Sequence, residues 1–246
     1  MKLRLDKLLV GRGLAASRER AQALILAGRV LVNEQKVAKA GAAVEEDSTI
    51  RLLGEDLKYV SRGGLKLERA LDHWNIDVTE KVCLDVGAST GGFTDCLLQR
   101  GAARVIAVDT GYGQMDLALR KDPRVLLLEK TNARYLRKED LNVEVDLVVM
   151  DVAFISATLV LPAVVKAAFG EVAAGKQILV LVKPQFEAGR DRVGKGGIVR
   201  DPAVHAEAVE KVRRTLLELG FGRCEVIESP ITGTEGNREF LLFGTF

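Results

Sequence analysis

The chain has 246 residues, of which 48% are hydrophobic and 28% charged, the composition of an ordinary globular protein with room for one large domain or for a large and a small one. Its apolar runs are too short to span a bilayer, and the charges that follow Met1 argue against a signal peptide. Three scattered cysteines and two histidines suggest neither a disulfide framework nor a metal site, so we expect a cytoplasmic protein with no metal and no membrane partner.

The net charge of +2 hides a strongly basic N-terminal segment. Residues 1–40 hold nine lysines and arginines against three acidic residues. An excess of this kind is typical of a protein whose partner is negatively charged, most simply a nucleic acid. A solvated basic face would explain the charge alone equally well, so the pattern within the segment has to decide.

Apolar spacing in this segment predicts two short helices followed by a β-hairpin. The first helix ends near Gly11, and Ser17 is a suitable N-cap for a second helix that ends at Gly28. An apolar strand at 30–32, a turn and a return strand from Lys36 form the hairpin. These elements together predict a compact unit of about sixty residues.

The stretch RLDKLLVGRGLAASRERAQALILAGRVLVNEQKV resembles the small RNA-binding domain first described in ribosomal protein S4, and the resemblance extends over residues 1–58. It implies that Arg4, Arg18 and Arg20 face RNA phosphates. Domains of this type guide an enzyme to structured RNA and seldom catalyse a reaction themselves.

A polar joint ends this domain, and residues 59–62 link it to a second domain over 63–246. Apolar runs in the second domain alternate with helical stretches, which predicts a mostly parallel sheet with helices on both faces, a Rossmann-like α/β fold behind a small α+β domain. The predicted strands lie at 82–86, 104–108, 125–128, 146–150 and 178–182, with a terminal antiparallel pair at 222–228 and 239–243.

The stretch CLDVGASTGGFTDCL reads as a strand, a glycine turn and the start of a helix, a common way to hold a nucleotide-like ligand. It completes neither phosphate-binding fingerprint. Phe93 stands where a P-loop needs lysine, and Ser89 stands where the dinucleotide fingerprint needs glycine. Asp85, two residues before Gly87, would be unfavourable beside a pyrophosphate and favourable beside a cation.

S-adenosylmethionine carries a sulfonium and an ammonium group and no phosphate, so it fits this loop best. Asp109 closes the next predicted strand, where an acid can accept hydrogen bonds from both ribose hydroxyls of a nucleoside. A tight turn with a surface acid would produce the same pattern without a ligand. The residues that this reading places at the cofactor are Asp85, Gly87, Gly91, Gly92, Phe93 and Asp109.

Four charged residues are candidates for catalysis. Asp151 and Lys183 end the fourth and fifth predicted strands, Glu239 lies on the last strand, and Lys66 follows a double glycine. A ribose hydroxyl is a poor nucleophile, and a lysine beside another lysine in a desolvated site can have its pKa lowered toward neutrality. Such a lysine can take the hydroxyl proton or stabilise the developing alkoxide, while the two acids orient the lysines. Taken singly, each residue could be a surface charge or a loop cap.

Together, Lys66, Asp151, Lys183 and Glu239 resemble the K-D-K-E tetrad of the FtsJ (RrmJ) family of ribose 2'-O-methyltransferases. With the S4-type domain in front, the whole chain resembles the TlyA, or haemolysin A-like, family of rRNA methyltransferases, in SRGGLKL, DVGASTGGFTD, MDVAFIS, VKPQFEAGR, GKGGIVRDP and EGNREF. The resemblance implies S-adenosylmethionine-dependent methylation of a cytidine 2'-hydroxyl in ribosomal RNA. The shorter family type, which this chain resembles more, is restricted to the large subunit.

The resemblance also implies cofactor contacts at Ser89, Asp109 and Asn132, the last beside the adenine. The glycine-rich loop EAGRDRVGKGGIVRD holds Arg190, Arg192 and Lys195, and we expect it to bind RNA and to become ordered when it does. Two other functions stay open, a membrane-active haemolysin and a catalytically inactive RNA-binding assembly factor. The sequence does not indicate an oligomeric state.

Overall fold

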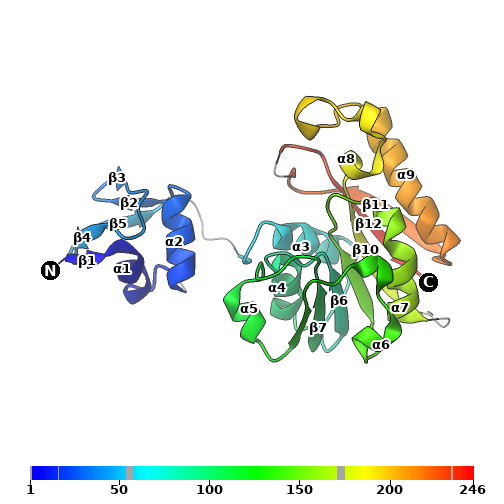
Figure 1. The fold of residues 1–246 in the computed structure, drawn as a ribbon, viewed down its shortest axis with the longest axis horizontal. Helices are drawn as coiled ribbons and strands as arrows, with labels where there is room; N and C mark the ends of the chain where they lie inside the picture. The colour runs from blue at the N-terminus through cyan, green and yellow to red at the C-terminus, as the bar shows by residue number, and fades with distance from the viewer. Residues whose placement is uncertain (1, 16, 54–57, 171–174, 234) are drawn as a thin grey trace. The chain divides into compact units, whose positions relative to one another are not determined.

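The computed structural model describes residues 2–15, 17–53, 58–170, 175–233 and 235–246. The chain forms two compact units, residues 1–56 and 57–246 (Figure 1). Each unit has its own apolar core and is described by itself.

The first unit packs two helices against short antiparallel strands. Its elements are β1 (Lys2–Arg4), α1 (Leu5–Gly11), α2 (Arg18–Leu26), β2 (Val30–Val32), β3 (Gln35–Lys36), β4 (Ala43–Glu45) and β5 (Ile50–Leu52). The strand β2 pairs with both β3 and β5, and β1 pairs with β4. Buried leucine, isoleucine, valine and alanine side chains of the helices and of β2 form the core.

The two predicted helices and the hairpin are confirmed, and the Ser17 hydroxyl caps α2 by accepting a hydrogen bond from the Arg20 backbone N–H. The strands β1, β4 and β5 were not predicted. Each has three residues that include a charged one, so none shows the continuous apolar run that identified β2.

The second unit contains a seven-stranded sheet in the order β11-β12-β10-β9-β6-β7-β8. Its strands are β6 (Val82–Val86), β7 (Arg104–Val108), β8 (Val125–Leu128), β9 (Leu147–Met150), β10 (Gln177–Val182), β11 (Arg223–Glu228) and β12 (Phe240–Thr245). Strands β6 to β10 are parallel, as predicted from their short aliphatic runs.

Helices cover both faces of this sheet, as predicted (Figure 1). The α-helices are α3 (Gly63–His73), α4 (Gly92–Gln99), α5 (Leu117–Lys121), α6 (Lys138–Leu141), α7 (Leu161–Phe169), α8 (Pro184–Glu187) and α9 (Pro202–Glu218). The 3-10 helices are η1 (Ala133–Tyr135), η2 (Ala157–Leu159), η3 (Arg190–Arg192) and η4 (Lys195–Gly197). Side chains of α3 and α4 belong to one core and those of α7 and α9 to the other, because successive strand residues point to opposite faces.

The two terminal strands pair with each other as predicted. Their position within the sheet was not predicted. The last strand, β12, runs antiparallel between β10 and β11 instead of lying at the edge. Its register sets Phe240 opposite Val182. Lys183, which follows Val182, and Glu239, which precedes Phe240, therefore lie side by side at the end of the sheet.

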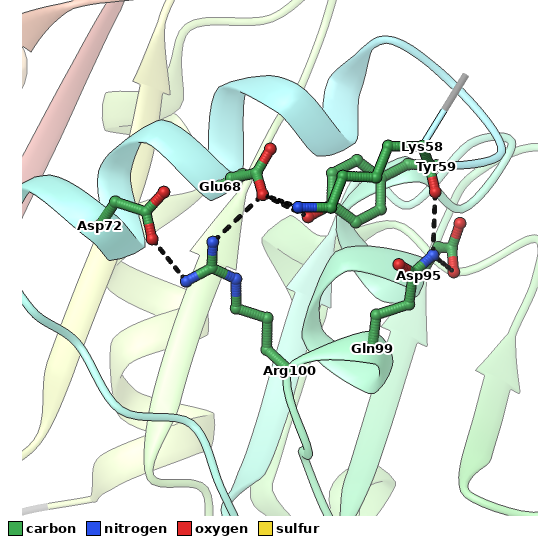
Figure 2. Close-up of polar contacts among 7 residues, drawn as sticks. All are labelled: Lys58, Tyr59, Glu68, Asp72, Asp95, Gln99 and Arg100. Atoms are coloured by element: carbon green, nitrogen blue, oxygen red, sulfur yellow. Dashed lines mark hydrogen bonds and ion pairs between the residues drawn. The ribbon is translucent and has the colours of Figure 1, made fainter. Parts of the chain in front are cut away.

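Residues 59–62, expected to be a linker, belong to the second unit. Tyr59 is 2% exposed, and its hydroxyl donates a hydrogen bond of 3.0 Å to Glu68 of α3. Figure 2 shows Arg100 reaching the same carboxylate from the end of α4, at 3.2 Å. The Val60 backbone N–H donates to Asp95 of α4 at 2.8 Å. The segment is thus held against α3 and α4, the helices that come before and after β6 in the chain.

Two glycines explain why this segment packs so closely. A Cβ at Gly64 would collide with the Tyr59 ring, and a Cβ at Gly92 would collide with the Ser61 hydroxyl. Each glycine therefore lets a helix N-terminus approach the segment directly. The sequence alone reads this segment as a linker because the α4 residues that hold the backbone at 58–60, Asp95 and Gln99, lie 35 and 41 residues further along the chain.

Candidate active site

The site lies where the strand order reverses. From β6 the chain adds β7 and β8 on one side, then crosses to β9 and β10 on the other. In open α/β sheets, ligands bind in the crevice outside the carboxyl ends of the strands at such a point. The glycine turn after β6 enters this crevice.

The turn requires glycine for two physical reasons. Gly87 has a φ of 85°, in the left-handed region, and a Cβ there would collide with the Asp151 carbonyl. Gly91, with a φ of 96°, is the N-cap residue of α4, and a Cβ there would collide with Leu119. The turn therefore packs its backbone tightly against the end of β9 and against α5.

A cavity of about 370 Å³ opens beside this turn. Four residues predicted at the cofactor line it, namely Gly87, Ser89, Asp109 and Asn132. The sequence reasoning missed the rest of the lining, which is largely apolar or uncharged: Val86, Val108, Thr110, Gln114, Thr131, Ala133, Val152, Ala153, Phe154, Ile155 and Val160. Asp109 and Asp151 are the charged residues of the described lining, which holds no lysine or arginine.

This lining fits a nucleoside that carries positive charge and no phosphate. The Asp109 carboxylate accepts hydrogen bonds from the backbone N–H groups of Ser89 (2.8 Å) and Gly111 (2.6 Å), which fixes its orientation at the end of β7. The Asn132 side chain accepts from the Arg134 N–H at 3.1 Å and caps η1. Asp109 keeps further lone pairs for ribose hydroxyls, and the apolar wall can hold an adenine ring.

Asp85 does not lie where the sequence placed it. Its side chain is fully buried and is not part of the described cavity lining, because residue 85 points to the face of the sheet that α4 covers. The Thr94 hydroxyl donates to Oδ2 at 2.6 Å, and Oδ1 has no hydrogen-bond partner among the described residues. Burial raises the pKa of this carboxyl to about 7, and the nearby Asp151 and Asp109 carboxylates act in the same direction.

The other turn residues expected at the cofactor have packing roles. Gly92 and Phe93 line a second cavity rather than the first, and Phe93 is 4% exposed within the core under α4. Gly91 lines neither cavity and instead permits the contact with Leu119.

The second cavity, of about 530 Å³, brings the four catalytic candidates together. Lys66, Asp151, Lys183 and Glu239 all line it. They form two ion pairs. Lys183 Nζ lies 2.5 Å from Asp151 Oδ1, and the Lys66 ammonium contacts the Glu239 carboxylate. Gly87, Ser89 and Asp151 line both cavities, so the two adjoin.

The sheet and one helix place these four residues. Asp151 follows β9, Lys183 follows the adjacent β10, and Glu239 precedes β12 opposite Lys183. Lys66 comes from α3, and its partner Glu239 lies 173 residues away along the chain. Each lysine faces a carboxylate, in line with the expectation that the two acids orient the lysines. The pairs hold two cations at the border of a cavity where negative charge can develop.

Phe154 is a site residue that the sequence reasoning missed. It lines the first cavity three residues after Asp151, is 92% exposed and has a φ of 64°, which is uncommon for a bulky side chain. Its ring centroid lies 5.3 Å from that of Phe186, three residues after Lys183. The stretches DVAF and KPQF show two aromatic residues at the same offset from Asp151 and Lys183, but exposure cannot be read from them.

Two of the three predicted RNA-contact residues of the first unit, Arg4 and Arg18, bind a buried acid. Arg4 and Arg18 donate hydrogen bonds of 2.8 and 2.9 Å to the Asp6 carboxylate. These contacts, that of Arg4 above all, hold the pKa of Asp6 well below its usual range. Both arginine side chains remain 46% exposed. Their contact with RNA, and that of Arg20, stays a prediction.

The basic loop after α8 is partly fastened to the second unit. Arg190 begins η3, Arg192 pairs with Glu207 at 2.5 Å, and Lys195 begins η4. The Asn237 amide accepts from the Val199 N–H and donates to the Gly197 carbonyl, each at 2.9 Å. The end of the loop is therefore anchored, which the glycine content did not predict. Ordering of the loop by RNA stays a prediction.

No helix in the described ranges is long and apolar enough to cross a bilayer. Nor do three or more histidine, cysteine or acidic side chains in those ranges form a group that could hold a metal ion.

Comparison with known proteins covers both units. Residues 59–246 match the FtsJ-like methyltransferase family, and residues 3–50 match the S4 domain. The chain is 47% identical over 241 residues to a Mycobacterium tuberculosis protein named 16S/23S rRNA (cytidine-2'-O)-methyltransferase TlyA, covering 98% of this chain and 88% of that protein.

Two further relatives widen the comparison. A Campylobacter jejuni protein named 23S rRNA (cytidine-2'-O)-methyltransferase TlyA is 34% identical over 186 residues, covering 75% of this chain and 70% of that protein. A solved structure from Streptococcus thermophilus, described as a hemolysin, is 42% identical with a TM-score of 0.75, covering 99% of this chain and 88% of that chain.

Proposed function

This chain belongs to the TlyA family of FtsJ-like methyltransferases with an S4 domain, and we propose that it transfers a methyl group from S-adenosylmethionine to a cytidine 2'-hydroxyl in ribosomal RNA. One observation carries the proposal. The first cavity, lined by Asp109 and apolar residues with no described lysine or arginine, shares Gly87, Ser89 and Asp151 with the cavity of the tetrad. A nucleoside cation in the first cavity would therefore lie next to the two ion pairs.

The residues of the chain have distinct proposed roles. Asp109, Ser89 and Asn132 would hold the nucleoside, and bound S-adenosylmethionine would supply an electrophilic methyl group. Lys183 Nζ, oriented by Asp151 Oδ1, would lie against the ribose oxygen, where the neutral amine would accept the hydroxyl proton or the ammonium would stabilise the negative charge on the oxygen. Lys66, held by Glu239, would add a second cation at the same cavity.

The first unit and the basic loop would bind the RNA. Arg4, Arg18 and Arg20 are proposed to contact phosphates, with Arg190, Arg192 and Lys195 of the second unit adding further contacts. Both relatives named TlyA have 23S in their names and one also has 16S, so large-subunit RNA is the proposed substrate. An rRNA substrate would place the activity in the cytoplasm.

The test is transfer of tritium from labelled S-adenosylmethionine to isolated large and small ribosomal subunits. We expect label in large-subunit RNA, at one ribose, with the next phosphodiester bond resistant to alkali because its 2'-oxygen is blocked. The Lys183→Ala variant is the matched control and should transfer far less. Label in a base, or none with either subunit, would contradict the proposal.

The same preparation separates the two alternative functions. Subunit binding without transfer under any condition would favour an RNA-binding assembly factor. Release of a dye from liposomes by the pure protein would favour a membrane-active haemolysin.

A further inference from the structure

A buried acid that is not part of either cavity lining joins the segments that carry Asp151 and Lys183. Glu187 is the last residue of α8, and its side chain is 2% exposed. Its carboxylate accepts hydrogen bonds from the Ser156 hydroxyl at 2.5 Å and from the Ala157 backbone N–H at 2.7 Å. Both partners lie on the segment after β9, so the carboxylate spans two adjacent strand ends.

On the Lys183 side the link is short and rigid. The single turn α8 begins directly after Lys183, and the Phe186 N–H donates to the Lys183 carbonyl at 2.9 Å. On α9, Lys211 Nζ donates to the Glu187 carbonyl at 3.0 Å and lies 3.4 Å from Oε2. The position of the Glu187 carboxylate is therefore coupled to that of Lys183 and fixed from a third element.

On the Asp151 side the segment leaves the sheet. The last registered pair between β9 and β10 is Met150 with Val180, and Asp151 itself is held by its N–H, which donates to the Val86 carbonyl at 2.9 Å. Residues 152–155 then run to Ser156, the N-cap of η2. Glu187 fastens the far end of this stretch, so the stretch is anchored at both ends.

We propose that Glu187 is a positioning residue for methyl transfer, which sets Asp151 against Lys183 without contacting substrate or cofactor. The proposal rests on the function proposed above. A pair of groups on two different loops keeps its 2.5 Å separation only if the loops are fastened to each other. Misplacement by about 1 Å can cost a hundredfold in rate.

The chain offers a matched control at the opposite end of the same strands. Asp146 precedes β9 and Lys176 precedes β10, and Asp146 accepts from Lys176 Nζ at 3.1 Å and from the Val82 N–H at 3.0 Å. It is thus a second carboxylate that ties β9 to β10, but away from the site. Asp146→Ala should cost stability without disturbing the tetrad.

The experiment compares Glu187→Ala, Glu187→Gln and Asp146→Ala with the wild-type chain. We expect Glu187→Ala to slow single-turnover transfer by about ten- to a hundredfold at saturating cofactor and RNA, a condition in which weaker cofactor binding by residues 152–155 does not limit the rate. Glu187→Gln should recover most of the rate, because its amide oxygen can accept from Ala157 and its NH₂ can donate to Ser156. Asp146→Ala should lower the melting temperature and leave the rate within about twofold.

Amide hydrogen exchange over 152–159 gives a readout that does not need activity. It should quicken in Glu187→Ala and not in Asp146→Ala. Unchanged exchange, a wild-type rate in Glu187→Ala, or an equal rate loss in both alanine variants would overturn the positioning role. Quickened exchange with no transfer by the wild-type chain would instead contradict the proposed function.

Discussion

Replacing Lys183 with alanine should abolish most methyl transfer and leave cofactor binding nearly intact. The Nζ atom lies 2.5 Å from Asp151 Oδ1 in the tetrad cavity, and Lys183 is absent from the described lining of the first cavity. A full charge pair at about 4 Å and an effective dielectric constant of about 20 is worth about 4 kcal/mol. If the ribose oxygen carries about half a charge in the transition state, the loss is about 2 kcal/mol, or roughly thirtyfold.

Loss of a preorganised group at a developing oxyanion commonly costs about a hundredfold to a thousandfold, so the expected fall in rate lies between roughly thirtyfold and a thousandfold. The change also leaves the Asp151 carboxylate, whose side chain is 21% exposed, without its ion-pair partner. We expect a stability loss of about 1–3 kcal/mol from that carboxylate. The double variant Lys183→Ala with Asp151→Ala should recover stability and stay inactive.

The assay is single-turnover transfer to large subunits, with cofactor affinity from calorimetry and the free energy of unfolding from urea titration. A rate within fivefold of wild type would remove Lys183 from the chemistry and, with it, the tetrad interpretation. A parallel fall in cofactor affinity would show that the lysine acts in binding instead.

Asp109→Ala should show the converse in the same assays, with weaker cofactor binding and a transfer rate that recovers at high cofactor concentration; a rate that stays low at saturation would refute this role. The Asp85 carboxyl, whose pKa burial raises to about 7, is neutral below that pH and ionised above it. The unfolded chain ionises this carboxyl near pH 4, so the free energy of unfolding should fall between about pH 4 and pH 7 in wild type and much less in Asp85→Asn by urea titration, and equal slopes would exclude Asp85 as the cause. Removing residues 1–56 should weaken RNA binding and reduce the slope of log affinity against log salt, while an unchanged slope in filter binding would mean that the first unit makes few phosphate contacts.

Local patterns in the sequence determined the elements that depend on neighbouring residues. The short aliphatic runs predicted the parallel strands, the Ser17 cap predicted the start of α2, and the glycine turn predicted a ligand loop after β6. The absence of a P-loop lysine at Phe93 pointed away from phosphate, and Gly87 and Ser89 of the same turn line the first cavity, whose described charged residues are Asp109 and Asp151. The strands and the helix cap are confirmed, because backbone conformation and capping depend on a few adjacent residues, and ligand binding at the loop stays a prediction.

Resemblance, rather than spacing, identified the tetrad, and only the tertiary structure showed how its members pair. The insertion of β12 between β10 and β11 sets Glu239 beside Lys183, and Lys66 reaches Glu239 across 173 residues of chain. The burial of Asp85 and the packing of Tyr59 were decided in the same way, by which face of a strand or helix a distant element covers.

The role of Glu187 shows the limit most clearly. In VKPQFE it reads as one more surface acid, because nothing nearby in the chain could satisfy a buried carboxylate. The structure brings Ser156, Ala157 and Lys211 to it from two other elements. A local pattern shows which hydrogen-bonding and charged groups a residue carries, but long-range packing decides whether that residue is buried and which partners it meets. Burial matters because a buried charge without a partner is costly, whereas a buried charge with partners helps to specify one structure.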